Sequence, residues 1–327
     1  MVPRVGPGPF FPTHRLLPAV LALGLVSCSS SPTSPLEVAQ LSLGAAYDVF
    51  VDGPTAYVSN NQGIAILDIG DIRYPRRIGL VQAESTQNVL RFHVSGDTLY
   101  TYGDRFSMFA LGGGGDPQHL ASYEGRGFLG GVQRRGDLLF LAYLHGGLEI
   151  LEIDDISKPS VLGFIESNGR VDGLALVGDY AYLAIPSRGL EVFQVEDPTA
   201  PVHVGTVPGT SGAADIHLHS GLLHLGCYIH GVKILDLTNP GSPSVIGSFN
   251  NGGETWGVFA HGSRLYTVDL AEGVEVLDID SPTHPRLIMT ETGYHPHDLF
   301  TDGRYLFLAD QDEHFVVLPL DLQEVSG

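Results

Sequence analysis

The feature that most constrains this chain is a unit of about 42 residues that recurs through most of its length. Each unit opens with a short apolar run that closes at a small residue: Gly53, Gly96, Gly136, Gly178, Ser220, Gly262 and Gly303. Four residues later stands an aromatic side chain or a histidine: Tyr57, Tyr100, Phe140, Tyr182, His224, Tyr266 and Phe307. Four short strands per unit at this period predict an all-β fold, a seven-bladed β-propeller of four-stranded antiparallel blades.

The third run of each unit repeats one pattern and gives the chain a family resemblance. It reads I-A-I-L-D-I from Ile64, L-E-I-L-E-I from Leu148, V-K-I-L-D-L from Val232 and V-E-V-L-D-I from Val274. In the first six units a proline follows before the fourth run. This rhythm resembles the LVIVD-repeat family of bacterial propeller proteins over about residues 36–320. The resemblance implies the propeller fold, but no particular activity, because that family is named for its repeat.

The last unit lacks a fourth strand, since the chain stops at Gly327 soon after the third. Residues 36–44 form a strand-like run that belongs to no unit of its own and matches the fourth runs of the others. A closed ring leaves no free sheet edge between blades. We therefore expect residues 36–44 to complete the last blade, which makes residues 36–327 a single propeller domain.

The N-terminal 35 residues precede this domain. Residues 16–26 are mostly apolar and have the length of a signal-peptide core. They lead into Leu25-Val26-Ser27-Cys28, which resembles the bacterial lipoprotein box. The resemblance implies that residues 1–27 are removed, that Cys28 carries lipid, and that the protein is extracytoplasmic at the outer membrane, on its periplasmic side or at the cell surface. Residues 28–35 then form a flexible tether. The alternative is an ordinary secretory signal.

Composition narrows the classes of partner and chemistry. The formal net charge of −20 and the lack of a basic run argue against nucleic acid as a partner. No catalytic, phosphate-binding or zinc-protease motif is present, so we assign no catalytic residue, metal or cofactor. If Cys28 carries lipid, Cys227 has no disulfide partner. Its place near the end of a second strand favours packing over a catalytic role with His224 or His230 as base. His217 and His219 could chelate a metal, but their places in the repeat favour packing. A monomer is expected.

Topology decides where a binding site would lie. In a propeller the first strands line the axis, and the loops that enter them share one face with the loops between the second and third strands. The ring positions these loops, and loops commonly carry binding residues. The first strands of four units begin with a charged residue: Asp48, Arg91, Asp215 and Asp298. The position one residue earlier in the repeat holds Tyr47, Asp172, Trp256 and His297 in units 1, 4, 6 and 7. The second-to-third loops on this face add His145, His230, Glu272 and Asp310.

Two hypotheses follow for function. The first is a lipid-anchored binding scaffold that presents its axial face to an unknown protein or small polar ligand. In this hypothesis Arg91 pairs with Asp48, which leaves Asp215 and Asp298 for the ligand. The alternative is a metal-dependent hydrolase or lyase, because His297 and three aspartates fall near one axis. The same polar groups could instead only fill the end of the channel. Metal retained by the purified mature protein would favour the enzyme.

Overall fold

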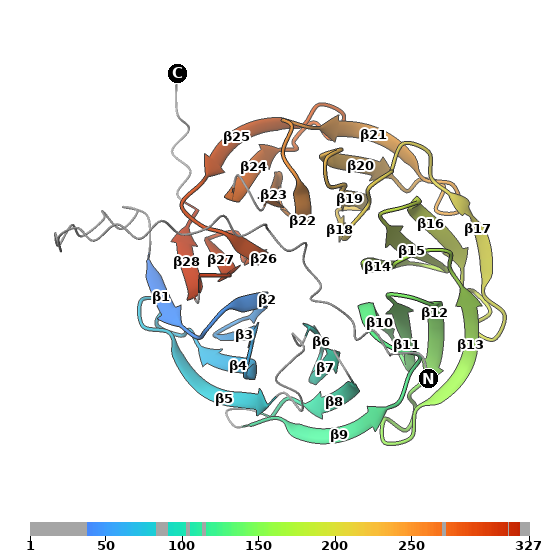
Figure 1. Ribbon diagram of the computed structural model, residues 1–327, viewed down its shortest axis with the longest axis horizontal. Coiled ribbons are helices and arrows are strands. Elements are labelled where there is room, and N and C mark those ends of the chain that lie inside the picture. Colours follow the sequence, from blue (N-terminus) through green and yellow to red (C-terminus); the bar gives the residue numbers. More distant parts are fainter. Residues whose placement is uncertain are drawn as a thin grey trace, which may run out of the picture. The chain divides into compact units, whose positions relative to one another are not determined.

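The computed structural model describes residues 38–82, 91–102, 105–112, 116–269, 273–312 and 314–320. Within them the chain forms 28 strands, and the strands pair into seven separate four-stranded antiparallel sheets. Figure 1 shows these sheets arranged as blades around one central axis, with the first strand of each blade innermost. The predicted seven-bladed β-propeller is confirmed.

Each blade takes its strands in chain order. Blade 1 is β2 (Ala46–Asp52), β3 (Thr55–Asn60), β4 (Gly63–Asp68) and β5 (Arg76–Gln82), and blade 2 is β6 (Arg91–Ser95), β7 (Thr98–Tyr102), β8 (Phe106–Ala110) and β9 (Gln118–Tyr123). Blade 3 is β10 (Leu129–Arg135), β11 (Leu138–Tyr143), β12 (Gly147–Glu152) and β13 (Ser160–Glu166), and blade 4 is β14 (Gly173–Val177), β15 (Tyr180–Ile185), β16 (Gly189–Gln194) and β17 (Val202–Thr206). Blade 5 is β18 (Asp215–His219), β19 (Leu222–Gly226), β20 (Val232–Asp236) and β21 (Ser244–Phe249), and blade 6 is β22 (Thr255–His261), β23 (Arg264–Asp269), β24 (Gly273–Asp278) and β25 (Arg286–Glu291). Blade 7 is β26 (Pro296–Thr301), β27 (Tyr305–Asp310), β28 (His314–Pro319) and β1 (Ala39–Ser42).

Strand β1 closes the ring from the other end of the chain. It pairs antiparallel with β28, from Ala39 opposite Val317 to Ser42 opposite His314. The N–H of Val38 extends this ladder by one more bond, to the carbonyl of Val317. The expectation that the N-terminal strand completes the last blade is confirmed. The paired strand is shorter than the run of residues 36–44 that the sequence suggested.

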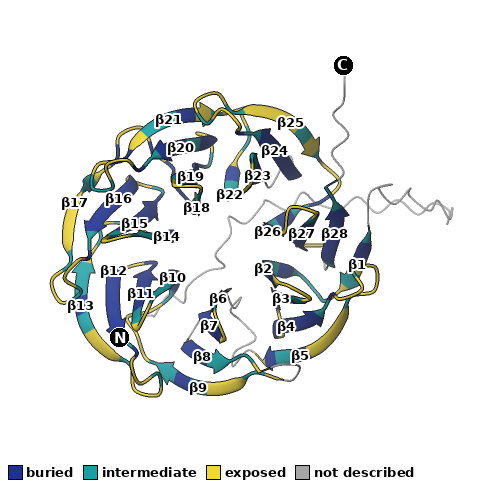
Figure 2. Ribbon diagram, turned by 180° about the vertical axis from the view of Figure 1, so that it is seen from behind, coloured by how far each residue is buried: buried dark blue, intermediate teal, exposed yellow. Residues whose placement is uncertain are grey.

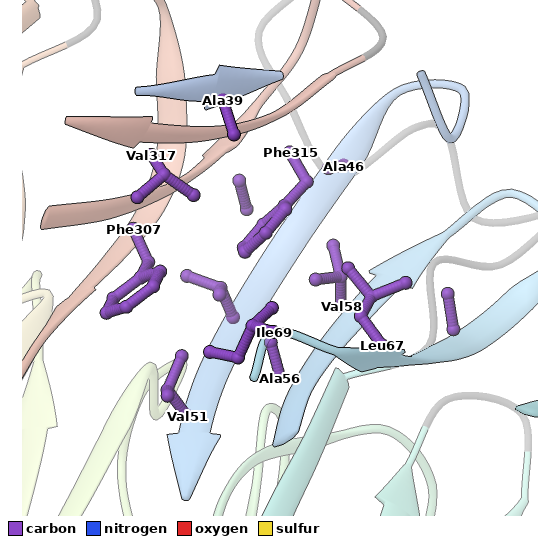
Figure 3. Packing of buried hydrophobic residues seen from close by; sticks show 13 residues of the cluster. Ala39, Ala46, Val51, Ala56, Val58, Leu67, Ile69, Phe307, Phe315 and Val317 are labelled. Atoms are coloured by element: carbon purple, nitrogen blue, oxygen red, sulfur yellow. The ribbon is translucent and has the colours of Figure 1, made fainter. Parts of the chain in front are cut away.

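Buried hydrophobic side chains gather between the blades and not within them, because each sheet packs on both faces. Figure 3 shows one such cluster, where Phe307 and Phe315 of blade 7 and Ala39 of β1 meet Val51 and Leu67 of blade 1. Every seam between neighbouring blades contains a cluster of this kind. This explains why the third strands carry apolar residues on both sides: β24, for example, is buried over its first five residues.

The outer strands contrast with the inner ones. Figure 2 shows buried second and third strands, and exposed stretches on the outermost strand of most blades. Tight turns connect them, and one glycine shows the constraint. Gly147 has φ of 127°, and a Cβ at this position would lie 2.1 Å from the carbonyl oxygen of Ile165. Only glycine lets the chain turn this close to the neighbouring backbone.

Candidate axial binding site

The axial mouth is the end of the ring at which the seven innermost strands begin. In four blades the pairing between first and second strands skips one residue at this end, which makes a β-bulge. The skipped residues are Tyr47, Gly130, Trp256 and His297. A bulge leaves its extra residue out of the ladder and re-aims its side chain. Three of the predicted mouth residues therefore owe their placement to a bulge.

Three aspartates of the mouth bind the backbone of the next blade. The Oδ2 atom of Asp298 accepts a hydrogen bond from the N–H of Val49 at 2.9 Å. Asp48 accepts one from Phe92 at 3.1 Å, and Asp215 accepts one from Val258 at 2.8 Å. In each case the next blade has a residue at the same repeat position as the aspartate, and the donor is the residue that follows it in sequence. These carboxylates thus latch blade 7 to 1, blade 1 to 2 and blade 5 to 6.

The same carboxylates interact with one another around the axis. Burial raises the pKa of Asp298 well above its usual value, and the nearby charge of Asp48 and a hydrogen bond between the two carboxyls raise it further. Burial also raises the pKa of Asp215, although the bond from Val258 opposes this. The Asp48–Asp298 pair therefore favours a shared proton, as two closely placed carboxyl groups do.

Arg91 carries the positive charge of this group. Its side chain keeps exposed surface, and its Nη1 donates to the carbonyl of Gly130 at 3.5 Å. Desolvation by the surrounding protein lowers the pKa of Arg91, but the charge interactions with Tyr102, Asp48, Asp215 and Asp298 raise this pKa by more. The expected forked pair between Arg91 and Asp48 is not among the hydrogen bonds of the described residues. Arg91 is instead held by the joint field of three carboxylates from three other blades.

A second polar group spans blades 4 to 6. The Asp172 carboxylate is buried, accepts from Arg170 Nε at 2.6 Å, and accepts from the Tyr228 hydroxyl at 3.1 Å. Burial raises the pKa of Asp172 despite these two donors. The Tyr228 ring meets the edge of Trp256 at 4.4 Å between centroids, and Tyr228 pairs with Thr255 across the seam. The Nε1 atom of Trp256 is buried without a hydrogen-bond partner.

The opposite side of the mouth holds Tyr47 and His297. Their rings lie 5.2 Å apart and are tilted by 32°, and the Tyr47 hydroxyl donates to Oδ1 of Asn61 at 2.9 Å. Burial lowers the pKa of His297, whereas the carboxylate of Asp310 raises it. Half-buried aromatic rings therefore lie on two sides of the axial charges.

The four predicted loop residues differ in environment. His145 and His230 are exposed in the loops between second and third strands. Asp310 is buried and accepts hydrogen bonds from the N–H groups of His295 and Asp312, so it organises its own loop. Glu272 and Cys28 lie outside the described residues.

Histidines and the second cysteine were also candidates in the sequence. The rings of His217, His224 and His261 each lie 6.4 Å from that of His219 at the seam of blades 5 and 6. His217 accepts the N–H of Ala260 at Nδ1, as a packed residue would. In the part of the chain that the structure describes, no three His, Cys, Asp or Glu side chains are grouped to hold a metal ion.

Cys227 is fully buried, and burial raises the pKa of its thiol to about 12. A thiol in this environment is protonated at neutral pH and is a poor nucleophile. This agrees with the packing role that the sequence suggested.

Sequence reasoning missed Arg170 and Tyr102. Arg170 lies in the approach to blade 4, and only its place two residues before Asp172 hints at the ion pair. Tyr102 of β7 pairs with Arg91 of β6 across the ladder. Counting residues outward from the turn between these two strands would have predicted this pairing.

The fold and this site define a β-propeller with a polar axial mouth, and comparison with known families gives its repeat type. Residues 43–81, 168–208 and 252–291 match the model of the LVIVD repeat. The chain therefore carries LVIVD repeats, as its third strands suggested. No curated protein sequence matches it.

Solved structures share the architecture at low sequence identity. A chain of the mitotic checkpoint complex is 11% identical with a TM-score of 0.71, and the match covers 94% of this chain and 99% of that one. U3-55K is 13% identical with a TM-score of 0.69, covering 88% and 100%. The WD40 domain of Neurospora crassa Pan2 is 14% identical with a TM-score of 0.65, covering 86% and 94%. Likeness at such identity establishes the fold alone. Among the described residues, no helix has the length and apolarity needed to cross a bilayer.

Proposed function

We propose that this protein is a lipid-anchored, extracytoplasmic binding scaffold that takes a protein or a small polar ligand at its axial mouth. One observation carries the binding role. Charged side chains from four different blades, Asp48, Arg91, Asp215 and Asp298, converge closely enough to interact across the axis. A few convergent polar groups are what binding sites use to orient a ligand.

The aromatic residues of the mouth support the same role. Tyr47 of blade 1 and Trp256 of blade 6 are the extra residues of two β-bulges at the mouth. Half-buried aromatic rings with a polar tip are favoured contact residues at binding surfaces. The anchor is supported by the sequence around Cys28, which resembles the bacterial lipoprotein box.

The binding role is tested with variants that keep the latch. In Asp215→Asn with Asp298→Asn, each amide oxygen still accepts the backbone N–H, but neither group can ionise or share a proton with a neighbouring carboxyl. The matched control is Asp179→Asn, an exposed carboxylate in the first turn of blade 4 at the other end of the ring. We expect all three proteins to melt alike. A partner or small molecule that co-purifies with the wild type and the control should be lost from the double variant. Full retention by the double variant would contradict an axial site.

The lipid anchor has its own test. In Cys28→Ala the modified thiol is missing, so the protein should leave the membrane fraction or remain unprocessed. Metabolic labelling with a fatty acid and fractionation of cells measure both outcomes. Unchanged processing and fractionation would show that the segment is an ordinary secretory signal.

A further inference from the structure

The direction of β1 shows at which end of the ring the N-terminal segment arrives. Ser42 lies opposite His314, which starts β28 at the axial mouth, and Ala39 lies opposite Val317, toward the other end. The chain therefore enters blade 7 from the face opposite the mouth and climbs toward the mouth. We call this face the anchor face. It carries the turns between first and second strands and the loops between third and fourth strands.

The length of the tether limits the distance between the bilayer and the point where the tether joins the ring. This step rests on the proposed lipid anchor at Cys28. Ten residue steps separate Cys28 from Val38, which span at most about 35 Å when fully extended. A six-residue strand is about 20 Å long, so the mouth lies roughly that much further along the same blade. The reach of the tether exceeds this length, so the tether fixes only the point of attachment, which is the anchor face at the seam of blades 7 and 1.

This part of the anchor face carries two arginine–tyrosine pairs. Arg73 lies 5.7 Å from the ring centre of Tyr74, and Arg304 lies 5.2 Å from that of Tyr305. Tyr74 is 72% exposed, the largest value among the exposed large hydrophobic residues that the structure describes. Ile72, the neighbour of Arg73 in sequence, packs against the same buried cluster as Tyr305, which brings the two pairs to one seam.

The pairs are joined to the entry point of the chain. Ile72 and Tyr305 pack against the same buried cluster as Val38, the first described residue. Arg76 and Arg77 extend the surface up the exposed start of β5. We call Arg73, Tyr74, Arg76, Arg304 and Tyr305 the seam patch.

The charge of this region differs from that of the anchor face at blades 3 and 4. The turns at 52–54, 68–77 and 302–304 hold four arginines and four aspartates, and Arg73 and Arg76 pair with Asp71 and Asp68. The corresponding turns of blades 3 and 4, at 135–137, 152–160, 178–179 and 194–202, hold two basic and seven acidic residues. An anionic surface would repel the second region and not the first.

We propose that the seam patch rests on the headgroups of an anionic phospholipid bilayer, with the axial mouth turned away from it. Tyrosine rings favour the level of the headgroups, and arginine stems lie along apolar surface while the guanidinium reaches phosphate. The tether brings the patch to the bilayer, and the charge difference across the anchor face sets the tilt. The site of the proposed function then faces the aqueous compartment.

The orientation is tested on the full lipidated chain in vesicles of phosphatidylethanolamine and phosphatidylglycerol. A fluorophore is attached to Tyr74→Cys or, as the matched control, to the exposed mouth position in His145→Cys. Native Cys227 is buried and should not react. A quencher on the lipid headgroups should dim the label at position 74 and leave the label at 145 bright. Equal quenching at both positions, or stronger quenching at 145, would overturn the orientation.

A charge variant separates the patch from the anchor. Arg73→Glu with Arg304→Glu should reduce the quenching at position 74 while the chain still sediments with the vesicles. Loss of each arginine near an anionic surface is expected to weaken this contact roughly fivefold. Unchanged quenching would overturn the patch, as would quenching that appears only when envelope proteins are added, since the patch would then bind a protein. A chain that does not sediment with vesicles would instead contradict the lipid anchor, and the orientation with it.

Discussion

A single carboxylate at the mouth has two tasks, and the structure separates them by atom. Oδ2 of Asp48 holds the Phe92 N–H of the next blade, while the charge of the group acts on Arg91 and Asp298. An unsatisfied buried N–H costs about 1–3 kcal/mol. Replacement by alanine thus tests the latch, whereas replacement by asparagine tests the charge.

His224 is the residue at which blade 5 departs from its neighbours. The equivalent position holds tyrosine or phenylalanine in the other six blades. His224 is buried, and burial lowers its pKa to about 4, although a hydrogen bond with the backbone of His217 opposes this shift. His217 beside it has its pKa lowered to about 3, by burial and then by His224 and His219.

This environment predicts a loss of stability in acid. Histidine in the unfolded chain titrates near about 6.5, so between that pH and about 4 the unfolded chain binds the proton and the folded one does not. Stability should therefore be fully present above about 6.5 and fall as the pH drops through this window. His224 alone would contribute on the order of 3 kcal/mol. His224→Phe, the residue of blades 3 and 7, should flatten the fall.

Denaturant unfolding of both proteins at a series of pH values between 4 and 7 measures this effect. The raised pKa values of Asp215 and Asp298 have the opposite sign, because their protonated forms are favoured in the fold, but both proteins retain them. The difference between the two curves reports the titration of His224 together with its effect on the pKa of His217. Parallel curves would show that this imidazole does not titrate differently on folding.

At the scale of the strand, the sequence was sufficient for the architecture and insufficient for the contacts between blades. The period and the unmatched run at 36–44 predicted seven blades and their closure, because strand number and order follow from local patterns. The position of Asp48, Asp215 and Asp298 near the axis followed from the same count. Their hydrogen bonds, from Phe92, Val258 and Val49 respectively, did not follow, since a bond between blades depends on the twist and spacing of neighbouring sheets. The bulges at Tyr47 and Trp256 were not predicted either, because the pairing shifts by one residue without any change in the length of the repeat.

Strand β1 is the element whose removal tests closure. Deleting residues 36–44 should bare the backbone edge of β28 and withdraw Val38, Ala39 and Leu41 from the cluster around Phe315. Each buried aliphatic side chain contributes about 1.5–3 kcal/mol, so the melting temperature should fall on the order of 10 °C. Deleting residues 29–35 instead is the control and should leave it unchanged.

A synthetic peptide of residues 36–44 sharpens the test. Added to the truncated ring, it can rejoin the open edge by strand addition. The peptide should restore the melting temperature, and a scrambled peptide should not. A truncated protein that melts with the intact one would mean that β1 is dispensable for closure.

At the scale of the whole molecule, closure makes all seven blades interior units. In an open repeat array each unit interacts only with its neighbours, and the terminal units have one interface fewer. Here every blade shares a buried cluster with both neighbours, including blades 7 and 1. Loss of any one blade therefore exposes two apolar faces, which disfavours partly unfolded states.

The expected outcome is one unfolding transition for the ring. Trp256 is the single tryptophan and reports on the seam of blades 5 and 6, whereas far-ultraviolet circular dichroism reports on all strands. Denaturant curves from the two signals should coincide in the intact protein, as a two-state transition requires. In the protein without residues 36–44, blades 7 and 1 lose their shared closure while the seam of blades 5 and 6 is untouched. Circular dichroism should then change before Trp256 fluorescence, and the curves should separate. Separate curves in the intact protein would mean that the blades unfold independently even in the closed ring.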